Sequence, residues 1–178
     1  TYTGAATLAA NATLSASSIT TGSTFNASTY AATLTTDAIA LGGNVSGSAG
    51  STLTIQPKTA TTTIAIGSAA TGTLKLDDTE LGYLQDGFSS ITIGSTTGTG
   101  AIAVAYTTPY TFLDPLTIRS NTSGGGAISA TSALNTGANS LTITTGGAVS
   151  VAAITSGTLA ITGTGITLNG NITTSGTQ

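Results

Sequence analysis

The chain has 178 residues and a net charge of −3, with charged residues only 5% of the total and no Cys, His, Met or Trp. This composition excludes a disulfide framework and thiolate or imidazole chemistry, and three scattered cations form no basic patch for nucleic acid. No apolar run approaches the roughly 18 residues of a membrane helix, so no membrane insertion is expected. A chain rich in Ile, Leu and Val with three prolines is also unlike a disordered one.

The amino-terminal residues 1–36 carry the weakest pattern of the chain. The Ala-rich stretch 5–12 would suit a short helix, but its Thr content argues against one. We interpret 1–36 as one or two weakly patterned coils, and 37–178 as regular coils, of a single domain covering 1–178. The interpretation depends on larger apolar residues mostly five or six positions apart: Leu8, Leu14, Ile19, Phe25, Tyr30 and Leu34.

Short alternating triplets dominate the rest of the chain and predict β-strands. In each triplet two aliphatic residues flank a small or polar one, which places two side chains on one face of a strand and one on the other. Turns rich in Gly, Ser, Thr and Asn separate them. The ten triplets are 53–55, 64–66, 74–76, 91–93, 102–104, 116–118, 141–143, 149–151, 159–161 and 166–168.

Two all-β architectures fit this pattern. A sandwich or barrel uses longer strands and commonly buries aromatic residues. A parallel β-solenoid stacks short strands around a narrow aliphatic interior. Because the strands are short and aromatic residues are only 4% of the chain, we predict the solenoid. At about 20 residues per coil, it would have roughly nine coils.

In the central segment, the apolar residues recur at the spacing of a helix and not of a strand. Asp77 is a predicted helix N-cap, and Glu80 completes the spacing of a capping box. Leu81, Leu84 and Phe88 then follow on one helical face, and Gly87 is placed to end the helix. The sequence therefore predicts a short helical excursion near residues 78–86 that lays its apolar face on the wall of the solenoid.

The same region resembles a known family. The acidic "DDTEL", the following "ITIGSTTGTGAIAV" and the later "LTIRSN" resemble a repeat of filamentous-haemagglutinin-like large bacterial surface adhesins and exoproteins, over about residues 76–121. The flanks are similar only in composition. The resemblance implies a right-handed parallel β-helix, an extracellular or cell-surface location, and a stalk or adhesive role. It implies no catalytic residues.

Four acidic residues in this segment are candidates for binding calcium, which prefers several oxygen ligands. They are Asp77, Asp78, Glu80 and Asp86. Capping and the helix dipole explain Asp77 and Glu80 without a metal, and the Gly-rich nonapeptide of calcium-binding solenoids is absent. We therefore predict no cofactor and retain calcium only as the alternative.

The densest aromatic group consists of Tyr106, Tyr110 and Phe112, between Pro109 and Pro115. Aromatic rings on a loop can stack on sugars, which suggests a carbohydrate-binding adhesin module as an alternative function. The simpler interpretation is that these rings cover an apolar loop or plug the end of a coil.

Repeated Thr-x-Thr pairs suggest a third function, ice binding, which requires a regular ladder of hydroxyl groups. The pairs begin at residues 52, 61, 71, 97 and 142, and several fall in Gly-rich turns. Because their spacing is irregular, we predict no regular ladder. Glycosylation sequons at Asn11, Asn26, Asn44, Asn121 and Asn171 are expected by chance in such a composition.

No enzyme is predicted, since Asp37 and Asp114 are isolated and the one acidic cluster has a structural explanation. The segment 171–178 resembles a further coil cut short, and no cap is apparent. Expected partners are therefore copies of this chain stacked end to end, or flanking coils of a longer chain, with cell-surface glycans or other cells as possible ligands. The expected role is a stalk or a head-to-tail fibre subunit.

Overall fold

A computed structural model describes residues 1–176 and is almost entirely β, with 43% of residues in strands and 3% in helix. The predicted all-β class is confirmed, and every strand pairing among these residues is parallel. All ten predicted triplets lie in strands. The 5–12 stretch contains a strand, Ala6–Thr7, and no helix.

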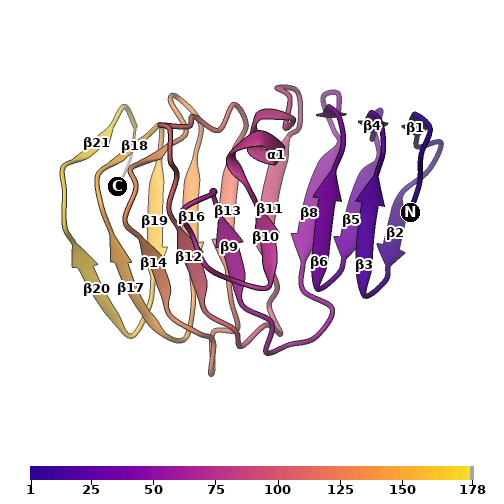
Figure 1. Ribbon diagram of the computed structural model, residues 1–178. Coiled ribbons are helices and arrows are strands. Elements are labelled where there is room, and N and C mark those ends of the chain that lie inside the picture. The colour runs from indigo at the N-terminus through magenta and orange to yellow at the C-terminus, as the bar shows by residue number, and fades with distance from the viewer. Residues whose placement is uncertain (177–178) are drawn as a thin grey trace.

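The strands form five parallel sheets (Figure 1). The longest has seven strands, in the order β19 (Leu159–Thr162), β16 (Leu141–Thr144), β13 (Leu116–Arg119), β11 (Ser90–Gly94), β8 (Thr52–Gln56), β5 (Ala31–Thr35) and β2 (Ala12–Ser15). A six-stranded sheet has the order β10 (Leu74–Leu76), β9 (Ile64–Ile66), β12 (Ile102–Val104), β14 (Ile128–Ala130), β17 (Ala148–Val151) and β20 (Gly165–Leu168).

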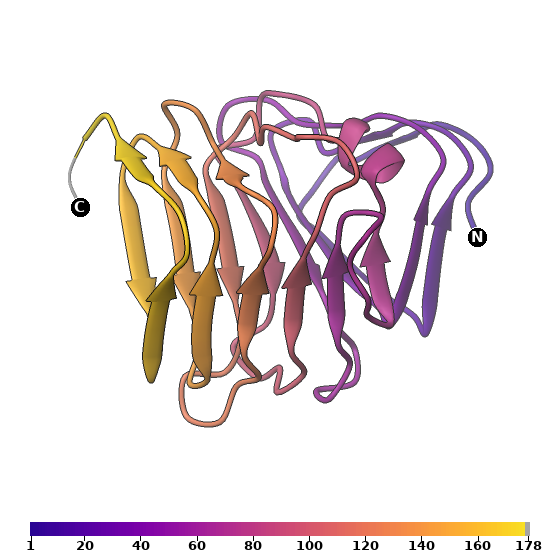
Figure 2. The same cartoon turned by 60° about the vertical axis from the view of Figure 1, so that its left-hand side comes forward.

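Three smaller sheets complete the structure. They are β1 (Ala6–Thr7) with β4 (Phe25–Asn26) and β7 (Val45–Ser46); β15 (Leu134–Asn135) with β18 (Ile154–Ser156) and β21 (Ile172–Thr174); and β3 (Ser18–Thr21) with β6 (Ala38–Leu41). Except for β9 and β10, successive strands belong to different sheets: β1, β2 and β3 are followed by β4, β5 and β6 on the same three sheets. Figure 2 shows the strands side by side along one long axis, with the first strands of the chain and the last ones at opposite ends.

The seven strands of the longest sheet are fewer than the nine coils predicted. Part of the difference arises between β8 and β11, where the chain contains β9, β10 and the helix α1 (Asp78–Gly82) before it returns to this sheet. The order of β9 and β10 is also reversed: β9 comes first in the chain but lies between β10 and β12, and β10 lies against β6.

The core consists of aliphatic columns made by equivalent positions of neighbouring strands. Ile55, Ile93 and Ile118 are paired in register in β8, β11 and β13, and each is fully buried. In such a column, each side chain stacks on the equivalent side chain of the neighbouring strand, about 4.8 Å away. Burying one such side chain stabilises the fold by about 1.5–3 kcal/mol, so these columns are the main source of stability.

Candidate functional site

The predicted helix is present but shorter than expected. In its capping box, the Asp77 carboxylate accepts from the Glu80 N–H, and the Glu80 carboxylate accepts from the Asp77 N–H, each at 2.9 Å. The helix ends with Tyr83 as C-cap, so the predictions of an excursion to residue 86 and of Gly87 as its end are wrong. Leu84 leaves the helix because it bridges to Val45, and Gly87 lies beyond the helix with a φ of 129°.

Glu80 also connects the helix to a distant strand. The Glu80 carboxylate also accepts a hydrogen bond from the Leu41 N–H, at the end of β6, at 2.8 Å. The Glu80 side chain is only 9% exposed. Burial raises the pKa of the Glu80 carboxyl, while the two N–H donors act in the opposite direction. Glu80 is therefore fully used in holding α1 against the sheets.

Asp78 connects two loops of the molecule. Its carboxylate accepts from the Ser68 N–H at 2.7 Å and from both the N–H and the hydroxyl of Thr107. Desolvation raises the pKa of Asp78, but the hydrogen bonds from Thr107 and Ser68 outweigh it and lower the pKa to about 2. This carboxylate is structural and has no oxygen left in need of a ligand.

The four candidate calcium ligands, the alternative considered from the sequence, are thus not assembled as a group. Asp77, Asp78 and Glu80 are engaged by protein donors, and residues 1–176 contain no cluster of three or more His, Cys, Asp or Glu able to hold a metal ion. Asp86 has a different neighbour, Asp114, whose carboxyl accepts from the N–H of the adjacent Gly87 at 3.0 Å and whose pKa is raised in part by Asp86.

Asp114 is predicted from the sequence to be isolated, because it is distant from Asp86 in the chain, and the prediction therefore missed that the two residues are neighbours. Pairing of Ile91 with Leu116 brings together the segments that precede β11 and β13, and with them the two carboxyl groups. Aligning the triplets 91–93 and 116–118 would have given this register.

The aromatic group packs mainly on itself and on the core. Tyr110 lies edge-on to Phe112 at 4.9 Å and to Tyr106 at 6.2 Å between ring centroids. Phe112 is 1% exposed, so it offers no surface to a glycan, and the Tyr110 hydroxyl donates to the Leu81 carbonyl at 2.6 Å. Burial raises the pKa of Tyr110 to about 12.

A pocket of about 350 Å³ adjoins these rings, and Tyr106, Pro109 and Tyr110 contribute to its lining. The Tyr106 hydroxyl is buried and has no hydrogen-bond partner among the described residues. Because Phe112 is buried and the Tyr110 hydroxyl is engaged, the geometry favours the structural interpretation of this group over the glycan-binding one.

A regular threonine ladder is present on the seven-stranded sheet, contrary to the prediction. The outward central residues of six neighbouring strands are all threonine and stand in register: Thr13, Thr33, Thr54, Thr92, Thr117 and Thr142, followed by Ala160. The prediction failed because it compared spacings along the chain. Connections of different length still place these threonines at the equivalent position of neighbouring strands. We call them the threonine column.

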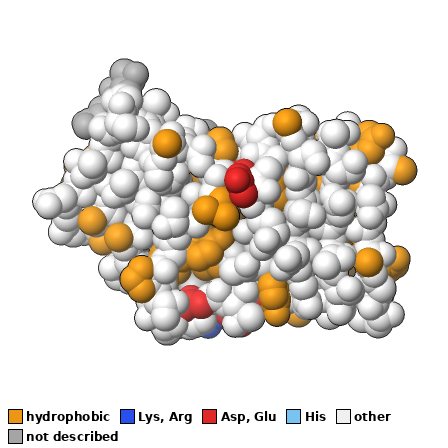
Figure 3. Space-filling view, turned by 90° about the horizontal axis from the view of Figure 1, so that it is seen from above, with side chains coloured by type: hydrophobic (Ala, Val, Ile, Leu, Met, Phe, Trp, Pro, Cys, Tyr) orange, Lys and Arg blue, Asp and Glu red, His pale blue; other side chains and the backbone are white. Residues whose placement is uncertain are grey.

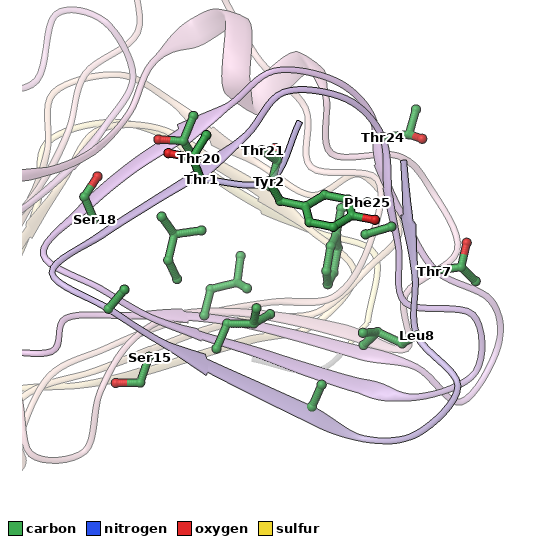
Figure 4. A pocket seen from close by; sticks show the side chains of 16 residues that line it. Thr1, Tyr2, Thr7, Leu8, Ser15, Ser18, Thr20, Thr21, Thr24 and Phe25 are labelled. Atoms are coloured by element: carbon green, nitrogen blue, oxygen red, sulfur yellow. The ribbon is translucent and has the colours of Figure 1, made fainter. Parts of the chain in front are cut away.

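The amino-terminal end of the molecule is hollow. A cavity of about 490 Å³ opens there, and Tyr2, Leu8, Leu14, Ile19 and Phe25 contribute to its lining (Figure 4). At the opposite end, Ile166 and Leu168 of β20 are 47% and 51% exposed. Both ends therefore expose positions that are buried in the middle of the molecule.

The surface between the ends has little charge, and Figure 3 shows few acidic or basic side chains on the face it presents. Within residues 1–176, no helix is long and apolar enough to cross a membrane. Comparisons with protein-family models, with curated proteins and with solved structures found no match.

Proposed function

We propose that this chain is a right-handed parallel β-helix that serves as a structural and adhesive segment of a bacterial extracellular or cell-surface protein. Three features support this proposal: the wholly parallel pairing of the described strands, the repeated return of the chain to the same sheets, and the resemblance of residues 76–121 to surface-adhesin repeats. A surface with little charge, in a chain rich in Thr and Ser, suits a spacer that is hydrated mainly through hydroxyl groups.

The observation that carries the proposal is the exposure of apolar residues at both ends. Leu14 on β2 is 43% exposed, whereas Leu34, its partner in the next strand, is 2% exposed. Leu168 is 51% exposed, while its partner Val151 is fully buried. The edge strands also carry unpaired backbone groups, which favour pairing with a further strand. The ends are thus complementary to coils like those within the chain.

End-to-end association is the testable consequence. We expect the purified chain to form rods of constant width whose length grows with concentration, measured by electron microscopy and sedimentation velocity, since a contact between unlike ends does not close. Leu14→Lys or Leu168→Lys should reduce the association at least tenfold, because a buried ammonium without a partner is strongly unfavourable.

Leu113→Lys is the matched control, since Leu113 is also 50% exposed but lies outside the strands, between Phe112 and Asp114. It should associate like the wild type. Monomers at every concentration would contradict the fibre-subunit form of the proposal and leave the stalk form, in which flanking coils cover the ends. Rods equally sensitive to all three substitutions would contradict association through the ends.

A second candidate function is ice binding, and the threonine column is the observation that favours it. Five of its six members are half-exposed and Thr13 is exposed. None of the six hydroxyls has an intramolecular partner among the described residues. Parallel strands repeat at about 4.8 Å, which is close to a repeat of the oxygen lattice in ice, so the column can order water in an ice-like row.

Ice binding would appear as slowed recrystallisation and as thermal hysteresis. Thr92→Tyr, in the middle of the column, should abolish both by lifting the face away from the lattice. Ser129→Tyr is the control, because Ser129 is exposed at the equivalent central position of β14 in the six-stranded sheet. Wild-type activity no greater than that of an unrelated protein, or equal loss in both variants, would refute this candidate.

A further inference from the structure

The carboxyl group of Asp114 is buried with only part of its hydrogen-bonding capacity used. The side chain is 3% exposed. Oδ1 accepts from the Gly87 N–H at 3.0 Å, whereas Oδ2 is buried and has no hydrogen-bond partner among the described residues. Buried polar atoms are normally paired, because an unpaired one forfeits its hydration. Oδ2 therefore lacks the partner that a buried carboxylate oxygen normally has.

A second carboxyl group, that of Asp86, lies beside Asp114 and adds a negative charge. Asp86 is exposed, and it directly precedes Gly87, whose N–H donates to Asp114. Burial and then the negative charge of Asp86 raise the pKa of the Asp114 carboxyl, although the N–H groups of Gly87 and Phe88 act in the opposite direction. Two adjacent carboxylates repel each other unless a proton or a cation lies between them.

The other acidic residues of the chain differ from this pair. Asp78 and Glu80 are held by protein donors, as described above. The Asp37 carboxylate receives the N–H groups of Lys58 and Thr59 and the hydroxyls of Thr59 and Thr62. Among the described residues, Asp114 is the one carboxylate with a buried oxygen that has no hydrogen-bond partner.

We propose that Asp86 and Asp114 form a calcium site that joins the segment before β11 to the segment before β13. Asp114 would supply its buried Oδ2, Asp86 would supply an exposed carboxylate, and water would complete the coordination. Calcium suits this pair because it accepts carboxylate oxygens in flexible geometry, whereas magnesium demands a near-ideal octahedron. With two protein carboxylates, the affinity should fall in the range of about 10⁻⁴–10⁻³ M typical of extracellular modules. The site is independent of the function proposed above.

Calorimetric titration of the full chain with calcium chloride at pH 7 tests the proposal. The wild type should bind one equivalent in that range. A tenfold excess over the dissociation constant should raise the melting temperature by about 3–6 °C. Asp86→Asn, a surface change that keeps the fold, should weaken binding at least tenfold, and Asp114→Asn should do the same while still accepting from Gly87.

Asp37→Asn is the matched control and should leave calcium binding unchanged, since Asp37 is already occupied by four donors. Absence of binding and of any thermal shift up to 10 mM calcium (about ten times the weakest expected dissociation constant) would overturn the proposal. Undiminished binding by Asp86→Asn would also overturn it by placing the ion elsewhere.

The competing explanation is a shared proton. A raised folded-state pKa means that metal-free protein loses stability as the pH rises from the unfolded-state pKa of Asp114 through its folded-state pKa. If Asp86→Asn removes that loss and wild-type stability at pH 7 does not respond to calcium, the pair holds a proton and the calcium proposal is wrong. If calcium restores the lost stability in the wild type alone, the proposal is upheld.

Discussion

Substituting Gly94 with alanine should destabilise the protein by about 3–5 kcal/mol. Gly94 ends β11 with a φ of 105°, a conformation that disfavours any residue with a Cβ. A Cβ at this position would also lie well inside contact distance of the Arg119 carbonyl on the neighbouring strand β13. Backbone strain and a backbone clash therefore add, and neither can be relieved by rotating a side chain.

Urea denaturation followed by circular dichroism would measure this loss. Gly124→Ala is the matched control, because a Cβ there meets nothing within 4 Å and Gly124 has no positive φ. It should change stability by about 1 kcal/mol or less, and stabilisation is the expected sign since alanine restricts the unfolded chain. A Gly94→Ala variant as stable as Gly124→Ala would show that β11 and β13 are not held as closely as described.

Substituting Ile93 with alanine should cost about 2–5 kcal/mol of unfolding free energy. Ile93 is fully buried between Ile55 and Ile118 in the aliphatic column. Its neighbours are fixed by the backbone ladders on both sides, so the sheet cannot collapse into the cavity. The cost should therefore lie in the upper half of that range.

Thr92→Ala is the control for this position, since Thr92 is the adjacent residue on the same strand and faces outward. It should cost under about 1 kcal/mol, as expected for a surface change. Equal losses at Ile93 and Thr92 would contradict the assignment of inward and outward faces in β11.

Local pattern was sufficient to predict the ten strands that contain the triplets and the start of the helix. Each triplet such as Leu116-Thr117-Ile118 contains its own period, and the Asp77–Glu80 capping box spans only four residues. Both are properties of adjacent residues, which do not depend on where the rest of the chain lies.

Features that depend on register could not be predicted in the same way. The helix ends early because Leu84 forms a β-bridge with Val45. Asp114 lies near Asp86 because β11 pairs with β13. The threonine column likewise requires knowing which strand follows which in the sheet. Connections of unequal length conceal these relations, because the energy of stacking depends on position in the coil and not on distance along the chain.

The reversed order of β9 and β10 bears on how the molecule would yield to tension. Peeling from the carboxy-terminal end would reach β10 before β9, yet β10 lies between β9 and β6. Peeling from the amino-terminal end would reach β9 first, and β9 lies between β10 and β12. From either direction, one strand must separate from two neighbours at once. Residues 64–76 should therefore act as a mechanical stop, where strand-by-strand extension gives way to a single, larger rupture.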